Sequence, residues 1–264
     1  MIIGIMFIAG LSAGSFVNAL VWRLHEHKDW LNGRSECVKC HHKLAAIDLV
    51  PVISWIILRG RCRYCHQKIS IQYPIVELAT LSLYLISYEL WPRQLSGAEI
   101  AVFVLWLGIL TGLIALAVYD LRWMLLPSKL IYVLLTASII MTCISVIAYN
   151  HTLSALVNYL VAVLIGGGLF YAIFTISKGK WIGGGDVRLG FLLGLLAATP
   201  GRSFLMIFLA SLLGLIVSLP FLTRHKLNRS SIIPFGPFLI AALIVVQFAG
   251  QDIIQLYTRF FING

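Results

Sequence analysis

The sequence predicts an all-α, multi-pass membrane protein with about eight transmembrane helices and a small cysteine-bearing domain between the first two. Three observations lead to this fold class. The 264-residue chain is 60% hydrophobic and only 11% charged, whereas about 25% of the residues in a soluble domain are charged. Apolar runs recur along it, most of them near the roughly 20 residues that a helix needs to cross a bilayer. Four of the five cysteines lie in the one long polar segment.

The apolar runs locate the expected helices. Seven runs are long enough to span a membrane, namely 2–22, 72–91, 99–119, 130–149, 154–177, 203–222 and 232–250. An eighth, 187–199, has only about thirteen residues, a length that fits either a short helix or a re-entrant segment. The first run has no basic segment before it and no clear cleavage site, so we expect it to be retained as the first helix.

Basic residues predict the topology. Eight crossings place the loops 23–71, 120–129, 178–188 and 223–231 on one side, and these carry 17 of the 20 Lys and Arg. Cytoplasmic loops are enriched in basic residues. We therefore expect the N-terminus outside and both Asp120 and Asp186 at the cytoplasmic side. The same bias explains the formal charge of +10, and we favour it over a nucleic-acid partner. The predicted parts are a first transmembrane helix (1–22), a cytoplasmic domain (23–71) and a transmembrane core (72–264).

The cytoplasmic domain contains two C-x-x-C pairs, Cys37 with Cys40 and Cys62 with Cys65, separated by 21 residues. Such spacing is typical of a tetrahedral four-cysteine zinc site. Two disulfides are the alternative, but they require an oxidising compartment, so we favour zinc. Four thiolates leave no open coordination position, which indicates a structural metal. Five histidines of this segment are expected to be solvated, namely His25, His27, His41, His42 and His66. Cys143 is expected to be a buried apolar residue.

The segment 47–58 between the two pairs is apolar but too short to span, and it contains Pro51. Two placements stay open for it. It lies at the membrane interface, or it packs over the zinc site.

Two carboxylates stand out in the apolar part of the chain. Asp120 ends one apolar run, and Asp186 follows three glycines, Gly183 to Gly185, and precedes another. Ionisable residues within a membrane are costly and mark functional sites. Two carboxylates that share one proton can hydrolyse a peptide bond, one activating water and the other polarising the carbonyl. The alternative is that each pairs with the arginine two residues later or caps a helix.

Two other features of the membrane part have less specific interpretations. Glu77 is a functional candidate by its depth, but a basic residue of the first loop is an equally good partner for it. The glycines at 166–168 lie inside an apolar run, where close helix packing is favoured over a ligand site.

With these motifs in place, the chain resembles the prepilin leader peptidases, bacterial membrane aspartyl proteases of type IV pilus, type II secretion and competence systems. The motifs that carry the resemblance are Gly14-Ser15-Phe16-Val17-Asn18 with Arg23-Leu24, the block from Cys37 to Cys65, Tyr73-Pro74-Ile75-Val76-Glu77, Asp120 with Pro127, Gly183 to Asp186, and Pro234-Phe235-Gly236-Pro237-Phe238. Two departures are visible. His25-Glu26-His27 replaces a proline after Arg-Leu, and Ser128 stands where the family often has an acid.

The resemblance implies that Asp120 and Asp186 are the catalytic pair of a GxGD-type protease in the bacterial cytoplasmic membrane. It implies cleavage of a short basic leader after glycine from prepilins or pseudopilins. Many family members with the cysteine-bearing loop also methylate the new N-terminus with S-adenosylmethionine, for which no binding residue can be assigned. Three alternatives remain: a peptidase without methyltransferase activity, an ion- or proton-coupled transporter, and a scaffold for pilus assembly.

Overall fold

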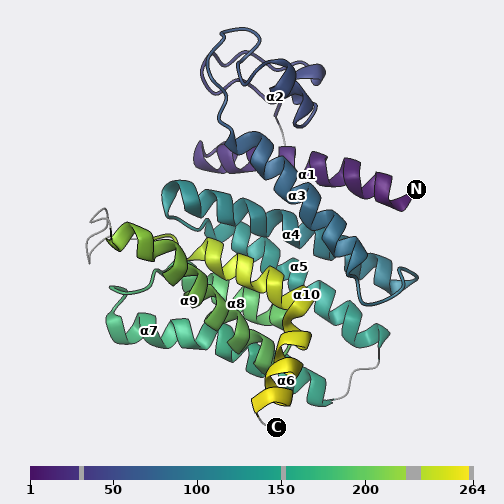
Figure 1. The fold of residues 1–264 in the computed structure, drawn as a ribbon, viewed down its shortest axis with the longest axis vertical. Helices are drawn as coiled ribbons and strands as arrows, with labels where there is room; N and C mark the ends of the chain where they lie inside the picture. Colours follow the sequence, from purple (N-terminus) through teal and green to yellow (C-terminus); the bar gives the residue numbers. More distant parts are fainter. Residues whose placement is uncertain (30–32, 150–152, 224–232, 262–264) are drawn as a thin grey trace. The chain divides into compact units, whose positions relative to one another are not determined.

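A computed structural model describes residues 1–29, 33–149, 153–223 and 233–261 of the chain (Figure 1). The described residues form helices and no β-strand, apart from two isolated bridges, Glu36 with Lys43 and Arg61 with Lys68. The all-α prediction is therefore confirmed. The chain forms two compact units.

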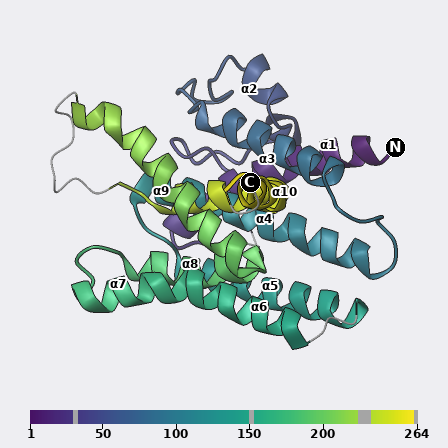
Figure 2. The ribbon, with the colours of Figure 1, turned by 60° about the horizontal axis from the view of Figure 1, so that its bottom comes forward.

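The first unit comprises residues 1–94 and 110–115. Its long helices are α1 (Ile2–His25) and α3 (Gln72–Glu89), which lie side by side in Figures 1 and 2. Between them, the described part of the cysteine-bearing segment has only a 3-10 turn, η1 (Ala46–Leu49), and a short helix, α2 (Ile53–Ile57). A segment with so little regular structure buries little apolar surface, so it needs another source of stability.

Helices α1 and α3 are antiparallel and approach closely at glycines of α1. A Cβ atom on Gly14 would lie 2.5 Å from Cα of Glu77, and one on Gly10 would lie 2.8 Å from Cα of Leu81. One turn further along α1, Asn18 donates a hydrogen bond from Nδ2 to the carbonyl of Tyr73, 3.1 Å away. Larger side chains at Gly10 or Gly14 would push the two backbones apart.

The second unit comprises residues 95–109 and those from 116 onward. Its elements are α4 (Ala98–Trp123) except for residues 110–115, α5 (Ser128–Ala148), α6 (Leu153–Val163), the π-helical turn η2 (Leu164–Gly168), α7 (Leu169–Ser177), α8 (Gly184–Ala197), α9 (Pro200–Thr223) and α10 (Gly236–Phe261). The short helix α8 packs against α5, α6, α7, α9 and α10 (Figure 2). Its Leu189, Leu192 and Leu193 are completely buried, so α8 forms the core of this unit.

Glycines bring α8 against the π-helical turn. A Cβ atom on Gly190 would lie 2.6 Å from the carbonyl oxygen of Gly166, and one on Gly194 would lie 2.7 Å from that of Ala162. The predicted packing role of the 166–168 run is confirmed for Gly166 and for Gly167, whose position is covered by the Phe191 ring. It is wrong for Gly168, which has open space around it.

Six helices of the described chain are long and apolar enough to cross a membrane. They are Ile2–His25, Ala98–Trp123, Ser128–Ala148, Leu153–Ser177, Pro200–Leu219 and Gly236–Phe260. The prediction of a multi-pass membrane protein is confirmed.

The other two predicted runs also form helices, but with weaker spanning character. Helix α3 has 18 residues and includes Glu77 and Glu89. Helix α8 has 14 residues, about 21 Å at 1.5 Å per residue, against a hydrocarbon core of about 30 Å. The count of eight crossings therefore stays a prediction. In the predicted loop 223–231, residues 224–231 lie outside the described residues, as does the start of the run 232–250.

Two local predictions need correction. The loop predicted at 120–129 is shorter, because α4 continues to Trp123 and α5 begins at Ser128. Cys143 is exposed on α5 instead of buried. A membrane-spanning helix presents apolar residues to lipid as well as to its neighbours, so an apolar side chain in such a helix does not have to be buried within the protein.

Candidate functional site

Asp120 lies in the last turn of α4 and is only 4% exposed. Its Oδ2 accepts a hydrogen bond from the backbone N–H of Gly236, 3.1 Å away. Gly236 is the first residue of α10. A Cβ atom at this position would lie 2.8 Å from Oδ2 of Asp120, so any side chain here would displace the carboxyl.

Asp186 lies in the first turn of α8, where Gly183 is the preceding cap residue. Its backbone N–H bonds to the carbonyl of Gly183, 3.1 Å away. A carboxylate in the first turn of a helix is stabilised by the partial positive charge of the unpaired N–H groups. Asp186 is half-buried, so its carboxyl at the helix N-terminus stays partly accessible.

The two carboxyls belong to one site. Leu126 lies against the backbone next to both. A Cβ atom on Gly185 would lie 3.0 Å from Cβ of Leu126, and one on Gly236 would lie 3.5 Å from its Cδ2. The structure therefore brings together the two aspartates that the sequence singled out, 66 residues apart in the chain.

The alternative of local ion pairs does not describe this site. Within the described residues, neither Asp120 nor Asp186 forms an ion pair with an arginine. Arg188 donates a hydrogen bond from Nη1 to Oγ of Ser128. The Cζ atom of Arg122 lies over the Trp123 ring, 4.7 Å from the ring centroid. Ser128, one of the two departures from the family pattern, is thus the acceptor for Arg188.

Two neighbouring carboxyls of this kind can perform acid–base chemistry on a peptide bond. Like charges close together disfavour double ionisation, so two neighbouring carboxyls can share one proton. The ionised carboxylate can then accept a proton from water, while the protonated partner donates to the carbonyl oxygen under attack. The hydrogen bond from Gly236 leaves Asp120 oriented before a substrate arrives.

The first unit contains a separate buried carboxyl, Glu77. Its Oε2 accepts a hydrogen bond from the backbone N–H of Val52, 2.7 Å away. Val52 has a positive φ of 62°, which is uncommon for a β-branched residue. Glu77 therefore fastens the segment before α2 to helix α3, a role different from the ion pair considered for it.

The four paired cysteines form one cluster. The sulfur atoms of Cys37, Cys40, Cys62 and Cys65 all lie within 4.8 Å of one another, and none is in a disulfide. Sγ of Cys37 lies 3.9 Å from Sγ of Cys65. Tetrahedral coordination at a Zn–S distance of about 2.3 Å separates the sulfurs by about 3.8 Å, so the cluster fits zinc. The five histidines of the segment are exposed, as expected.

Burial and hydrogen bonds shift the pKa of Cys65 in the cluster and of Asp48 in the same segment. The backbone N–H of Gln67 lowers the pKa of Cys65, but burial and the other three thiols outweigh it and raise the pKa to about 12. A bound divalent cation has the opposite effect on the thiol pKa, because it favours the ionised thiolates and takes them as ligands. Burial raises the pKa of Asp48, but hydrogen bonds from Arg63, Tyr64 and the N–H of Ala45 outweigh it and hold that pKa below its usual range.

One residue of the site was not assigned a role from the sequence. The sequence analysis names Gly236 only as part of the motif at 234–238. Its contact with Asp120 joins residues 116 positions apart, which periodicity and composition do not report. The signal that could have found it is the presence of two prolines around a glycine immediately before an apolar helix, since such a segment fixes a bend.

Two family models match the chain. Residues 8–91 match the bacterial peptidase A24 N-terminal domain, and residues 107–219 match the type IV leader peptidase family. The first range contains the four clustered cysteines, and the second contains Asp120 and Asp186.

Three similar proteins share the name prepilin leader peptidase/N-methyltransferase. The one from Vibrio cholerae is 32% identical over 92% of this chain and 94% of its own length. Those from Bacillus subtilis and Aeromonas hydrophila are both 29% identical, over 97% and 98% of this chain and 98% and 94% of their own lengths. No solved structure matches the chain.

Proposed function

Because the chain belongs to the type IV leader peptidase family, we propose that it is a membrane aspartyl endopeptidase that removes the short leader of prepilin-like proteins after a glycine. We further propose that it methylates the new N-terminus. The observation that carries the peptidase proposal is the placement of Asp120 and Asp186 at one site. The name shared by the similar proteins supports both activities.

The two aspartates have distinct positions, and these support distinct roles. Asp120 is buried and held by the N–H of Gly236, whereas Asp186 is half-buried at a helix N-terminus. In the proposed reaction, one carboxylate takes a proton from the attacking water. The other carboxyl gives its proton to the carbonyl oxygen. As the tetrahedral intermediate collapses, the first carboxyl donates the proton it took from water to the leaving nitrogen, and a hydroxyl of the intermediate returns a proton to the second, which releases the leader with a new carboxyl end and the mature N-terminal amine.

The cysteine cluster supports a structural zinc ion. Cys37, Cys40, Cys62 and Cys65 would hold it, and it would join the two halves of a segment that has little core of its own. For methylation, S-adenosylmethionine is the expected methyl donor. No described residue is assigned to bind it.

The basic residues support an orientation in the cytoplasmic membrane. We propose that the N-terminus lies outside and that both aspartates lie at the cytoplasmic side, where the leader of a membrane-inserted prepilin also lies. This rests on the 17 of 20 Lys and Arg in alternate loops, of which Arg224, Lys226 and Arg229 lie outside the described residues. The proposed parts are the helix 1–22, the zinc-binding domain 23–71 and the peptidase core 72–264.

Mass spectrometry of a prepilin incubated with the purified protein and S-adenosylmethionine tests the proposal. Wild type is compared with Asp120→Asn and Asp186→Asn, which preserve side-chain volume but cannot ionise. We expect cleavage after the leader glycine, with an added methyl group, and a loss of cleavage of at least about 100-fold in each variant. Cleavage that persists in either variant would exclude the pair. Absence of cleavage by wild type would favour transport through the two acids or a scaffolding role.

A further inference from the structure

The start of helix α2 is joined to helix α3, which packs along the candidate membrane-spanning helix α1. The antiparallel register places Glu77 of α3 level with Gly14, near the middle of the 24-residue helix α1. The hydrogen bond from Val52 to Glu77 therefore brings the start of α2 to this depth. Glu77 follows Gln72, the first residue of α3, by five residues, which is about 7.5 Å along the helix.

The other end of α2 is closer to the surface. Trp55 donates a hydrogen bond from Nε1 to the carbonyl of Ile69, 3.3 Å away. Ile69 precedes the start of α3 by three residues. The segment from Val52 to Trp55 thus follows the first turns of α3, from the level of Gly14 toward the start of α3. Tryptophan is enriched where a bilayer changes from acyl chains to headgroups.

The side chains of α2 that point away from the unit are apolar. Ile53, Ile56 and Ile57 are 55%, 62% and 67% exposed. Ile47, Leu49 and Val50, just before α2, are also exposed. On helix α3, Ile75 and Leu78 are also exposed. An exposed apolar surface of this extent is expected in contact with lipid or a partner.

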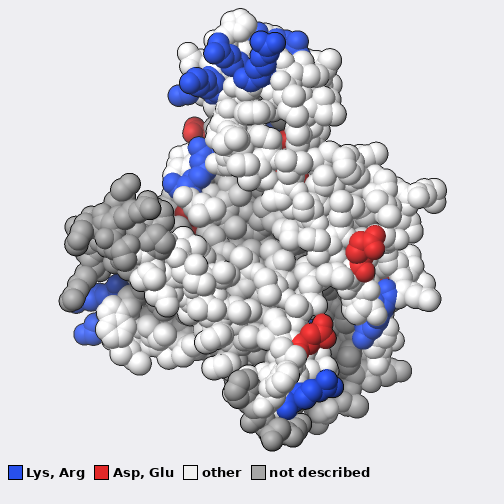
Figure 3. Space-filling view, viewed as in Figure 1, with Lys and Arg blue, Asp and Glu red and all other residues white. Residues whose placement is uncertain are grey.

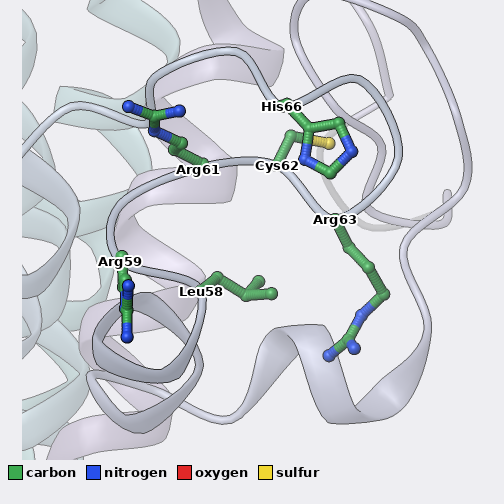
Figure 4. Close-up of a pocket in the computed structure, with 6 residues that line it drawn as sticks. All are labelled: Leu58, Arg59, Arg61, Cys62, Arg63 and His66. Carbon is green, nitrogen blue, oxygen red and sulfur yellow. The ribbon is translucent and has the colours of Figure 1, made fainter.

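Basic side chains adjoin the apolar face. Lys and Arg gather on the cysteine-bearing segment (Figure 3). After α2, Arg59 and Arg61 line one side of an open pocket of about 450 Å³, with Arg63 on the opposite side and the Leu58 side chain extending toward the middle (Figure 4). Arg63 pairs with Asp48 at 2.7 Å, whereas no ion pair joins Arg59 or Arg61 to another described residue. Two such cations suit the phosphates of lipid headgroups.

From this arrangement we infer that α2 is a membrane anchor of the zinc-binding domain. Its isoleucines insert among the acyl chains of the leaflet at the C-terminal end of α1, and Arg59 and Arg61 bind phosphates of anionic lipids. The occupant is the bilayer that α1 already crosses, because the depth set by Glu77 leaves α2 beside that bilayer. An amphipathic segment of this kind binds at the interface through apolar burial and charge together.

Photo-crosslinking of the full-length protein tests the inference. Benzoylphenylalanine is placed at Ile57, at Leu78 of α3 as the lipid-facing reference, and at Val38 between the first two cysteines as an exposed control. Each protein is reconstituted in liposomes of phosphatidylethanolamine and phosphatidylglycerol and checked for prepilin cleavage. We expect lipid adducts by mass spectrometry at positions 57 and 78 and none at position 38.

A lipid adduct at position 78 without one at position 57 would overturn the inference. So would an adduct at position 57 that shifts from lipid to a prepilin added to the liposomes, because the apolar face would then be a substrate site. Phosphatidylglycerol should form a share of the position-57 adducts at least twice its share of the bilayer. Arg59→Gln with Arg61→Gln should return that share to the bilayer value, whereas Lys39→Gln should not. An unchanged share in the double variant would exclude the phosphate contacts.

Discussion

The backbone N–H of Gly236 donates a hydrogen bond to Oδ2 of Asp120, and the same carboxyl oxygen occupies the space that a Cβ atom of residue 236 would need. The start of α10 and the end of α4 are therefore in direct contact at the proposed catalytic carboxyl. The amide orients the carboxyl, and the absence of a side chain makes the contact possible. Residue 236 lies beyond both ranges that the family models match, yet it contacts the site.

Replacing Gly236 with alanine should impair cleavage without unfolding the protein. The new methyl group would lie 2.8 Å from Oδ2 of Asp120, so the carboxyl must move by several tenths of an ångström or more. Misplacement of a catalytic group by about 1 Å can cost about 100-fold in rate. We expect kcat to fall by about 10- to 100-fold in a prepilin cleavage assay. Gly108→Ala, on the same helix as Asp120 and with open space at its Cβ position, should retain full activity.

Alanine at Gly190 should destabilise the second unit. Its Cβ atom would meet the carbonyl oxygen of Gly166 at 2.6 Å, which is backbone and cannot rotate away. Overpacking of this kind costs about 1–3 kcal/mol, and a lower unfolding temperature in detergent would report it. Gly168→Ala is the matched control, because its Cβ position is open. Equal unfolding temperatures for both variants would contradict close packing of α8 on the π-helical turn.

Loss of one cysteine ligand should release the metal and loosen the segment between α1 and α3. Cys37→Ser removes one of four clustered sulfurs, and three remaining ligands bind zinc more weakly. We expect about one zinc per wild-type chain by elemental analysis, a loss of most of it in the variant, and faster proteolysis within residues 33–71. Cys143→Ser should change neither property, since Cys143 lies outside the cluster. Full zinc content in Cys37→Ser would exclude this cluster as the metal site.

Asp48 should stabilise the cysteine-bearing segment above about pH 4 and lose this effect in acid. Its folded-state pKa lies below the usual value, because the hydrogen bonds from Arg63, Ala45 and Tyr64 outweigh the effect of burial. A depressed carboxyl pKa contributes stability above the unfolded value of about 3.9, and this is lost as pH falls through the folded pKa. Asp48→Asn should therefore destabilise the segment at pH 7, by about 1 kcal/mol for a partly exposed pair.

Chelator titration with zinc release as the readout measures this change. The variant should release zinc at a lower chelator concentration than wild type at pH 7. Asp252→Asn, an exposed carboxyl in α10, should behave as wild type. A variant indistinguishable from wild type would show that the pair with Arg63 contributes nothing to the segment.

Much of the fold and both aspartates could be predicted because the relevant signals are local. A helix that crosses a bilayer must be apolar over most of its length, and this makes Asp120 and Asp186 conspicuous in their surroundings. The C-x-x-C spacing reports the cysteine cluster for a similar reason, since two ligands on one tight turn share a metal.

The remaining features depend on tertiary contacts. The acceptor role of Glu77 toward Val52 needs the fold of the intervening loop, and no pairing rule based on charge predicts a backbone partner. The predicted run 99–119 ends before Asp120 and Arg122 because both residues are charged. Charged residues in the last turn of a spanning helix can reach the interface, so the helix continued past them to Trp123.

The length of α8 has a consequence for how a cleavage site is chosen. Its neighbours α4 and α10 have 26 residues each, but α8 has 14, so its two ends cannot both lie at the surfaces of a bilayer about 30 Å thick. Asp186 lies on the first turn of this short helix. Each helical residue inserted between the leader glycine and the membrane segment of a substrate would displace the scissile bond by about 1.5 Å along that helix. We therefore expect the spacing between the leader glycine and the membrane segment to limit which bonds reach Asp186.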